Sequence, residues 1–338
     1  MTTRETLETL CRGQSLSREA ALELFSRVLR GEVSEVELAA LLIGFKAKGE
    51  TPEEIAGAAQ ALRDAALALD VGSLKVSDSC GTGGDGAATV NISTAVALVV
   101  AEAGVPVAKH GNRSISSRCG SADVLEASGV KIDAPPEVSR RCLDELGICF
   151  LFAPQYHAGV RHAMPVRRAL GVRTLFNLLG PLSNPARPAW QVVGVYDATL
   201  CAPLARTLGL LGCERALVVN GCGLDEIALH GPTVAALWRE GSLEELVLRP
   251  EQAGLQRRPL EALRGGGAEE NARWLRDLLG GRGEAAHAEI VAINAGALLW
   301  VSGRAADLRE GTAQALEVLR AGGAEGRLAR WAERSHGA

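Results

Sequence analysis

A glycine-rich turn between an extended stretch and an apolar helix constrains the fold of this chain more than any other feature. The turn spans residues 81–86 (GTGGDG), it follows an expected strand at 74–79, and the apolar run 92–103 predicts the helix that leaves it. Because glycines can adopt positive φ and carry no Cβ, backbone N–H groups in such a turn can converge on an anion at the positive end of the helix. The stretch therefore predicts a phosphate-binding loop inside a βα unit.

A second cluster of anion-binding side chains follows the next expected strand, at 105–109. Lys109 and Arg113 supply positive charge, and the residues around them supply amide and hydroxyl donors. Because the C-terminal ends of neighbouring parallel strands meet at one edge of a sheet, we expect both loops to line one anion site. The candidate residues of the second loop are Lys109, His110, Gly111, Asn112, Arg113, Ser114, Ile115, Ser116 and Ser117.

The glycine turn does not match two common nucleotide-binding motifs. The dinucleotide fingerprint needs an acidic residue about 20 positions after its first glycine, and here that position falls at Glu102, inside the expected helix, where its carboxylate could not reach a ribose. A P-loop needs Gly-Lys-Ser or Gly-Lys-Thr to close the turn, and neither is present. A tight turn without a ligand is the remaining alternative, which the basic cluster after the next strand disfavours.

Composition and charge narrow the class of protein. A chain of 338 residues exceeds one typical domain, so two domains are expected. The net charge of −4 gives no overall field that would attract nucleic acid or an anionic membrane, so we expect neither as a partner. No apolar stretch of about 18 residues occurs, and the N-terminus carries charges where a signal peptide is apolar. The eight cysteines have no metal-binding spacing. These features predict a cytoplasmic protein with reduced thiols.

The first 70 residues carry the capping signals of short helices. Ser34 with Glu37, and Thr51 with Glu54, form capping boxes ahead of apolar stripes. These helices have more apolar surface than a small domain can bury alone. We therefore predict a homodimer joined through this helical region, with a plain helical cap as the alternative.

From residue 75 onward, expected strands and helices alternate, which predicts a largely parallel sheet covered by helices on both faces. The segment 162–186 breaks this alternation with a helix through Val166 and Leu170, followed by a Pro/Gly/Asn-rich stretch. The Arg/Gly-rich region 249–283 is expected to include mobile loops, and 284–334 is expected to be helical. The expected strands are 74–79, 105–109, 148–152, 190–196, 215–220 and 233–239.

Several motifs, in this order and at this spacing, resemble the anthranilate phosphoribosyltransferase family of tryptophan biosynthesis. They are GTGGD, VNIST, KHGNRSISS, GSADVLE, FLFAPQYH, MPVRRALGVRTLFNLLGPLSNPA, GLDEIALHGPT and INAGALLW, and they cover nearly the whole chain. The resemblance implies an α/β fold with a small helical domain and a larger domain with a mostly parallel central sheet flanked by helices. It implies a helical domain at 1–72, to which about 163–186 returns, and a phosphoribosyl-pyrophosphate-binding α/β domain at 73–162 and 187–338.

The resemblance also implies a reaction, in which anthranilate displaces pyrophosphate from 5-phosphoribosyl 1-pyrophosphate to give N-(5-phosphoribosyl)anthranilate. The aromatic amine already has a usable lone pair, so the tasks left to the enzyme are to neutralise the leaving group and position the nucleophile. No general base is expected, and positioning falls to His110, Asn112 and Arg167. Besides the second loop, the implied substrate-binding residues are Gly81, Gly84, Asp85, Thr89, Asn91, Ile92, Ser93, Thr94, Ser121 and Arg167.

The resemblance implies a Mg²⁺ site at Ser93, Asp225 and Glu226, since hard oxygen ligands together with substrate phosphates suit this ion. For the acidic pair, a solvated loop is the alternative. Arg167 corresponds to the residue that holds the anthranilate carboxylate, a task suited to a planar bidentate donor. The alternatives are a helix-surface arginine for Arg167 and a buried, hydrogen-bonded core histidine for His110.

Two other functions share this fold. A pyrimidine nucleoside phosphorylase also has a glycine-rich phosphate loop, but it would not need the acidic magnesium pair or Arg167 as placed here. A non-enzymatic paralogue that binds nucleic acid would be expected to have a basic surface and to lack the catalytic positions. In this chain the net charge is negative and those positions are filled.

Overall fold

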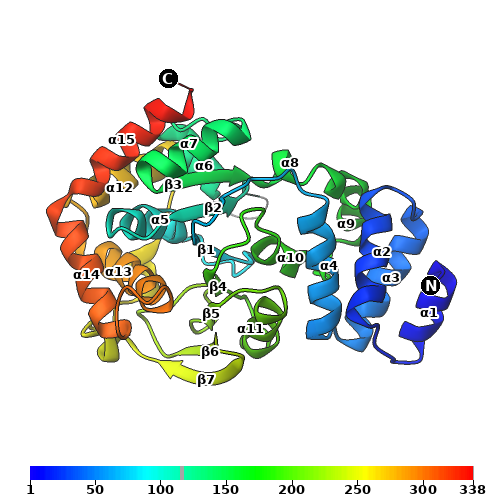
Figure 1. Cartoon of the computed structure of the whole chain (residues 1–338). Coiled ribbons are helices and arrows are strands. Elements are labelled where there is room, and N and C mark those ends of the chain that lie inside the picture. Colours follow the sequence, from blue (N-terminus) through cyan, green and yellow to red (C-terminus); the bar gives the residue numbers. More distant parts are fainter. Residues whose placement is uncertain (115–117, 338) are drawn as a thin grey trace.

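Four helices, α1–α4, form one end of the molecule (Figure 1). The structure is a computed structural model that describes residues 1–114 and 118–337. Both expected capping boxes are present: the backbone N–H of Ser34 donates to Glu37 at 3.0 Å, and that of Thr51 donates to Glu54 at 2.9 Å. These caps begin α3 and α4 at the residues that the sequence predicts. The four helices span Thr3–Cys11, Arg18–Leu29, Glu35–Lys48 and Pro52–Asp64.

A seven-stranded sheet in the order β3-β2-β1-β4-β5-β6-β7 forms the centre of the larger part of the molecule. The strands from β3 to β5 are parallel, and β6 and β7 are antiparallel. The prediction of a small helical unit beside a mostly parallel sheet is therefore confirmed, although β7 was not expected. The strands span Ser77–Gly81 (β1), Val107–Gly111 (β2), Ile148–Phe152 (β3), Trp190–Gly194 (β4), Arg215–Asn220 (β5), Thr233–Arg239 (β6) and Ser242–Leu248 (β7).

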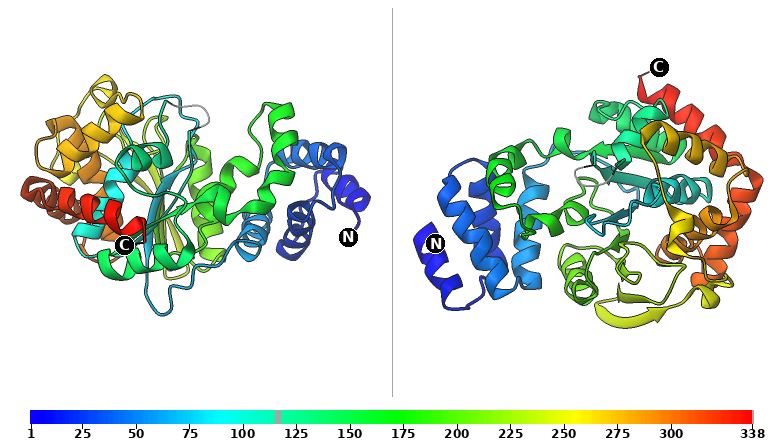
Figure 2. Two further views of the ribbon diagram at one scale, coloured as in Figure 1. Left: turned by 90° about the horizontal axis from the view of Figure 1, so that it is seen from above. Right: turned by 180° about the vertical axis from the view of Figure 1, so that it is seen from behind.

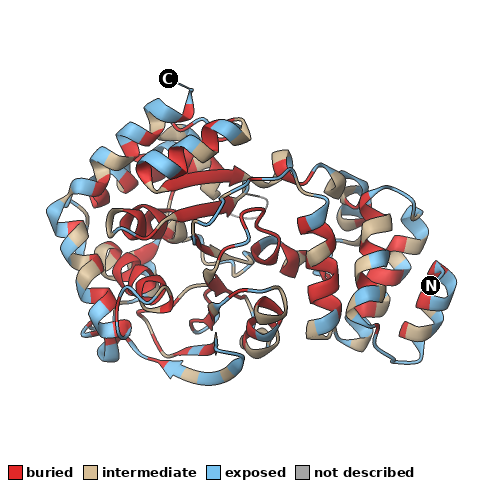
Figure 3. Ribbon diagram, in the orientation of Figure 1, coloured by how far each residue is buried: buried red, intermediate tan, exposed pale blue. Residues whose placement is uncertain are grey.

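Alternating side chains of the central strands enter two different cores. Val192 and Leu217 lie in the core that includes α5 (Ile92–Glu102) and α13 (Ala285–Val301). Their neighbours Val193 and Val218 lie in the core that includes α11 (Cys201–Leu210) and continues into helices α2–α4. This period of two is what a sheet covered on both faces requires. Figure 3 shows the buried strands and the largely buried helix α4 between the two parts.

The chain returns to the helical end after β3, as Figures 1 and 2 show. Helix α9 (Met164–Leu170) was expected, and it packs against α3. Helix α10 (Phe176–Leu182) was not expected, because its Gly180-Pro181 pair reads as a loop. The proposed domain bounds at 72, 163 and 186 stay a prediction.

The C-terminal helices cover the outer side of α5 and α13. Within the region 249–283, α12 occupies Ala268–Leu279 and buries Ala272, Leu275 and Leu279 along one face. The sequence analysis did not identify this helix, because the glycines and arginines around it obscure its apolar stripe. The remaining helices are α6 (Ser121–Ala127), α7 (Pro136–Leu146), α8 (Ala153–Tyr156), α14 (Leu308–Ala321) and α15 (Gly323–Ser335), with 3-10 turns at Ala158–His162, Ala198–Leu200, Pro250–Ala253 and Leu260–Leu263.

Within residues 1–114 and 118–337, no helix has the length and apolar character needed to cross a membrane. All eight cysteines are free thiols, and most of them are buried.

Candidate active site

The strand order reverses between β1 and β4, since the chain runs from β1 to β2 on one side and from β4 to β5 on the other. In parallel sheets, ligands bind beyond the C-terminal ends of the strands at such a point. Gly81 ends β1 and pairs with Gly194, which ends β4. The predicted glycine turn leaves the sheet at this position, so the topology supports the anion site that the sequence predicts.

The loop after β5 brings Asp225 onto this pair of glycines. Its Oδ2 accepts a hydrogen bond from the backbone N–H of Gly83 at 2.7 Å. A Cβ atom at Gly81 would overlap the Asp225 carboxylate, and one at Gly194 would overlap its carbonyl group. Glycine at both strand ends is therefore what lets the acidic residue approach the turn.

The acidic residues here carry charge that the protein only partly neutralises. Burial, and then the nearby Asp85 carboxylate, raise the pKa of Asp225 above its usual range. The pKa of Glu226 is raised well above its usual range by burial and then by Asp225, against a lowering effect of Lys109 and of the Ser93 backbone N–H. These half-buried carboxylates are costly to ionise without a counter-charge, so a bound cation is favoured here.

Lys109 joins the two predicted anion loops. Its side chain is buried, and Nζ donates to the carbonyl oxygen of Ser79 at 2.8 Å and to Oγ of Ser93 at 3.2 Å. The ammonium group therefore lies between the end of β1 and the first turn of α5.

The glycine loop has left-handed backbone at Gly83, Gly84, Gly86 and Ala88, where φ is between 49° and 83°. This geometry is the one that lets successive N–H groups face an anion. Asp85 is held inside the loop because its Oδ1 accepts the N–H of Ala87 at 3.1 Å. Of the other predicted residues, Thr89 and Asn91 lie in this loop, and Ile92, Ser93 and Thr94 form the first turn of α5.

The predicted residues of the second loop differ in their contacts. Arg113 is already paired, since its Nη1 lies 3.0 Å from Asp123 and 2.7 Å from Glu126, and these acids raise its pKa. Oγ of Ser121 donates to the carbonyl oxygen of Asn112 at 3.2 Å, at the start of α6. The backbone N–H of Ser114 donates to Asp123. Gly111 ends β2; the predicted residues Ile115, Ser116 and Ser117 lie outside the described residues.

Arg167 lies on α9, in the segment that returns to the helical end. Its guanidinium lies 5.3 Å from the centroid of the Phe176 ring, and Nη1 contacts Sδ of Met164 at 3.8 Å. The side chain is half-buried, and burial lowers its pKa. No carboxylate pairs with Arg167 among residues 1–114 and 118–337, so this cation differs from an ordinary surface arginine.

His110 and His157 form a buried pair with ring centroids 5.0 Å apart. Nδ1 of His110 is hydrogen-bonded to the carbonyl oxygen of Gly180 at 3.1 Å, as expected for a core histidine. Burial lowers the pKa of His110 to about 3 and that of His157 to about 4, so both rings are neutral at pH 7. A neutral His110 can position a substrate, but it carries no charge for an anion.

Three residues near the loops escaped the sequence analysis. Arg173 donates to the carbonyl oxygen of Gly84, and its guanidinium lies 4.0 Å from the centroid of the Tyr196 ring. Asn294 of α13 accepts the N–H of Ile227 at 2.8 Å, and this contact holds the residue after the acidic pair. Asn271 of α12 contacts Asn91. Because these contacts join segments far apart in sequence, no local sequence pattern predicts them.

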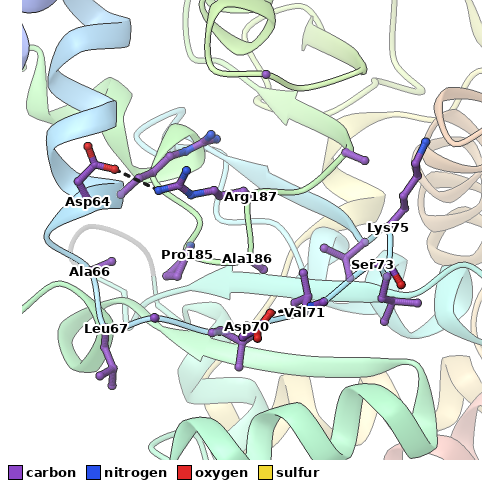
Figure 4. A pocket seen from close by; sticks show the side chains of 18 of the residues that line it. Asp64, Ala66, Leu67, Asp70, Val71, Ser73, Lys75, Pro185, Ala186 and Arg187 are labelled. Atoms are coloured by element: carbon purple, nitrogen blue, oxygen red, sulfur yellow. Dashed lines mark hydrogen bonds and ion pairs between the residues drawn. The ribbon is translucent and has the colours of Figure 1, made fainter.

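A cavity lies at the opposite end of the parallel strands (Figure 4). It has a volume of about 640 Å³, and its lining includes residues 69–76 before β1, 185–187 before β4, and Gly212 and Glu214 before β5. Arg187 and Asp64, which both line this cavity, form an ion pair at 3.0 Å. This cavity therefore lies at the N-terminal ends of the strands, away from every predicted site residue.

Two family models and several known proteins match the chain. The glycosyl transferase family models match as a helical bundle domain at residues 4–66 and as an a/b domain at 73–325. Anthranilate phosphoribosyltransferase from Sorangium cellulosum (strain So ce56) is 62% identical over 96% of this chain and 93% of that protein. The solved enzyme of that name from Thermus thermophilus has 46% identity and a TM-score of 0.94, covering 98% of this chain and 99% of the other. A Saccharomyces cerevisiae enzyme, solved in complex with PRPP and Mg, shares the fold with a TM-score of 0.89, at 24% identity and with 99% and 98% coverage. The chain therefore belongs to the glycosyl transferase family of these models and, within it, to the anthranilate phosphoribosyltransferases.

Proposed function

We propose that this chain transfers the phosphoribosyl group of 5-phosphoribosyl 1-pyrophosphate (PRPP) to the amine of anthranilate, releasing pyrophosphate. The observation that carries the proposal is the meeting of the glycine loop with a half-buried, incompletely neutralised acidic pair, Asp225 and Glu226, at the point where the strand order reverses. The names of relatives that share more than half of its residues support the same activity.

In this reaction the anthranilate nitrogen attacks the anomeric carbon of the ribose while the bond to pyrophosphate breaks. Negative charge grows on the departing pyrophosphate, and stabilisation of that charge lowers the barrier. Backbone N–H groups of the glycine loop and the start of α5 can bind these phosphates, with Lys109 beside them. The neutral His110 is suited to positioning the aromatic substrate rather than to removing a proton.

The oxygen donors of this site fit Mg²⁺, which prefers oxygen ligands and keeps several waters or phosphate oxygens. Ser93, Asp225 and Glu226 would hold the ion, whose charge would offset the acidic excess and that of the pyrophosphate. No group of three or more His, Cys, Asp or Glu residues that could hold a metal occurs in the described part of the chain. The remaining coordination positions would therefore fall to waters and substrate phosphates.

Arg167 is the proposed partner of the anthranilate carboxylate. It is a half-buried cation whose pKa is lowered by burial, and an anionic ligand would relieve that cost. Its guanidinium is held near Phe176, so little side-chain freedom remains to be lost when the ligand binds. We keep as proposed substrate-binding residues those predicted from the sequence in both loops, together with Ser121.

The direct test is loss of anthranilate fluorescence in the presence of PRPP, with and without Mg²⁺, with the product identified by mass. The proposal expects saturable, Mg²⁺-dependent formation of phosphoribosyl anthranilate. Absence of this product together with phosphorolysis of a pyrimidine nucleoside would replace the proposal by the phosphorylase function.

We also propose a homodimer joined through α3. Four apolar residues on the outward face of this helix, Val36, Ala40, Ile43 and Ala47, are all exposed and recur at helical spacing. Val36 is 81% exposed, and such exposure of an apolar stripe to water is unfavourable unless a partner covers it. Val36→Glu with Ile43→Glu should therefore give a monomer mass by light scattering. Val247→Glu, at an exposed position on β7, is the matched control and should leave the mass at that of a dimer. A wild-type monomer at micromolar concentration would refute the proposal.

The free thiols support a reducing compartment, and we propose the cytoplasm. Cell fractionation that finds the protein in an oxidising compartment would contradict this location.

A further inference from the structure

The segment 263–266 forms a short antiparallel bridge with the glycine loop. The N–H of Val90 donates to the carbonyl oxygen of Leu263 at 3.0 Å, and the N–H of Gly265 donates to that of Ala88 at 2.9 Å. This bridge fixes the end of the loop just before α5 begins. The glycine loop is therefore braced by a segment that lies about 175 residues further along the chain.

Gly265 makes this approach possible. A Cβ atom at this position would stand 2.6 Å from the carbonyl oxygen of Thr89, closer than side chains approach a backbone. The requirement for glycine here is independent of any predicted ligand. It indicates that close contact between the two segments is built into the sequence.

A chain of hydrogen bonds continues from this bridge to Cys119, which lies between the second anion loop and α6. The N–H of Gly266 donates to Oδ1 of Asn271 at 2.8 Å, and Nδ2 of Asn271 donates to Oδ1 of Asn91 at 2.8 Å. Nδ2 of Asn91 then donates to the carbonyl oxygen of Cys119 at 3.1 Å. We name this chain from Gly266 through Asn271 and Asn91 to Cys119 the amide relay.

The two ends of the amide relay fix its direction. A backbone N–H can only donate, so Asn271 must turn its oxygen to Gly266 and its amino group to Asn91. The carbonyl group of Cys119 can only accept, so Asn91 must turn its own amino group to it. The orientation of both side-chain amides follows from these backbone partners, without any assumption about which end of each amide is oxygen.

Asn91 precedes the first residue of α5, where a side chain often caps the helix, yet its side chain makes no capping bond. Its amide is used instead to join the glycine loop to the segment that begins α6. Asn271 is 2% exposed, so solvent cannot replace it as the partner of Asn91. Loss of the Asn271 amide would leave Oδ1 of the half-buried Asn91 without this donor.

We propose that Asn271 is a positioning residue that acts through Asn91 to hold the glycine loop in register with Cys119, where the chain passes from the second loop into α6. The proposal rests on the proposed function for the identity of the ligand, but not for the contact itself. Asn271 belongs to α12, outside both loops, and touches no proposed substrate position other than Asn91 among the described residues.

The first test needs no ligand. Hydrogen exchange of the backbone amides of residues 86–92 should speed up about tenfold in Asn271→Ala, because the bridge loses its neighbouring support. Ala272→Gly is the matched control, since it weakens the same helix at the next buried position and leaves the relay intact. Equal exchange in wild type and Asn271→Ala, or an equal increase in Ala272→Gly, would overturn the proposal.

The second test measures the affinity for PRPP with Mg²⁺ by calorimetry, without anthranilate. Asn271→Ala should weaken binding about 3- to 10-fold, the range expected for one lost hydrogen bond. Asn271→Asp should weaken it about 10- to 100-fold, because a carboxylate would face Oδ1 of Asn91 and the two oxygens would repel. The KM for anthranilate should change less than about twofold in either variant, because the relay lies at the pyrophosphate loops.

These outcomes separate the relay from the proposed function. Wild-type protein that does not bind PRPP would refute the ligand, and the hydrogen-exchange result would still decide the relay. Wild-type protein that binds PRPP, with both Asn271 variants binding as well as Ala272→Gly does, would refute the positioning role.

Discussion

Charged residues at the C-terminal ends of the parallel strands differ from those at the N-terminal ends in how fully partners neutralise their charges. We call these two ends the C-terminal edge and the N-terminal edge. At the C-terminal edge, Asp225 and Glu226 have raised pKa values, and Arg167, on the segment that returns to the helical end, has no carboxylate of its own among the described residues. At the N-terminal edge, the cavity is large, but Arg187 pairs with Asp64 and Lys75 pairs with Glu214 at 2.8 Å.

In this molecule, therefore, the volume of a cavity is a poor guide to the position of the active site. The four ion-pair residues at the cavity are each about half exposed, so water satisfies what their partners do not. The acids at the C-terminal ends of the strands are half-buried without enough counter-charge to keep their pKa values in the usual range, a cost that folding alone does not favour. A bound cation and a phosphorylated substrate would resolve that cost, and the following experiments test whether they do.

The largest effect is expected at the acidic pair. Asp225→Asn with Glu226→Gln keeps shape and removes both charges, so kcat at saturating substrates should fall by on the order of a hundredfold or more. Excess Mg²⁺ should restore part of the loss, because substrate phosphates would still bring metal. A folded double variant with wild-type kcat would show instead that the acidic pair belongs to a solvated loop.

Arg167→Ala should be next in size. A hydrogen bond to a charged group contributes about 1.5 to 3 kcal/mol, so kcat/KM for anthranilate should fall roughly 10- to 200-fold, with little change in PRPP affinity. Arg167→Lys should recover this only in part, because an ammonium cannot reproduce the bidentate fork. Unchanged anthranilate kinetics in Arg167→Ala would remove this residue from the site.

The buried histidines predict a dependence of stability on pH. The folded protein holds the pKa of His157 near 4, below its usual value, so between about pH 6.5 and 4 the unfolded chain binds the extra proton. The stabilisation from neutral His157 is complete above about pH 6.5 and is lost as the pH falls. Relative to His157→Asn, wild type should lose roughly 1 to 3 kcal/mol of unfolding free energy between about pH 7 and pH 4, measured by denaturant titration. A constant difference between the two proteins would contradict the buried neutral ring.

The smallest effects are expected at the cavity. Arg187→Met or Lys75→Met removes one partner of an exposed pair, so the unfolding free energy should change by about 0.5 kcal/mol or less. Turnover should stay within about twofold of wild type, because neither residue lies near the predicted site. A tenfold loss of kcat in either variant would contradict the claim that the two edges differ in function.

Much of this site could be predicted from local patterns. The glycine turn, the strand that precedes it and the Asp225-Glu226 pair are each contiguous in sequence, and the sheet topology follows from alternating strands and helices. The contribution of α12 could not be predicted, since Asn271 meets Asn91 only through tertiary packing. Strand β7 was missed because it lies at the sheet edge with mostly polar, exposed residues. The pairing of Arg113 with Glu126 was also hidden, because a positive charge beside a phosphate loop suggests a ligand rather than a neighbouring helix.

The central claim is that half-buried, incompletely neutralised acids at the C-terminal ends of the strands hold the metal with the substrate. It is tested most directly by calorimetric titration of Mg²⁺ into protein saturated with PRPP. Wild type should bind Mg²⁺ saturably, and Asp225→Asn with Glu226→Gln should lose most of that affinity. The matched double variant at the other edge, Asp64→Asn with Glu214→Gln, should bind as wild type does. Equal Mg²⁺ affinity in all three proteins would contradict the account.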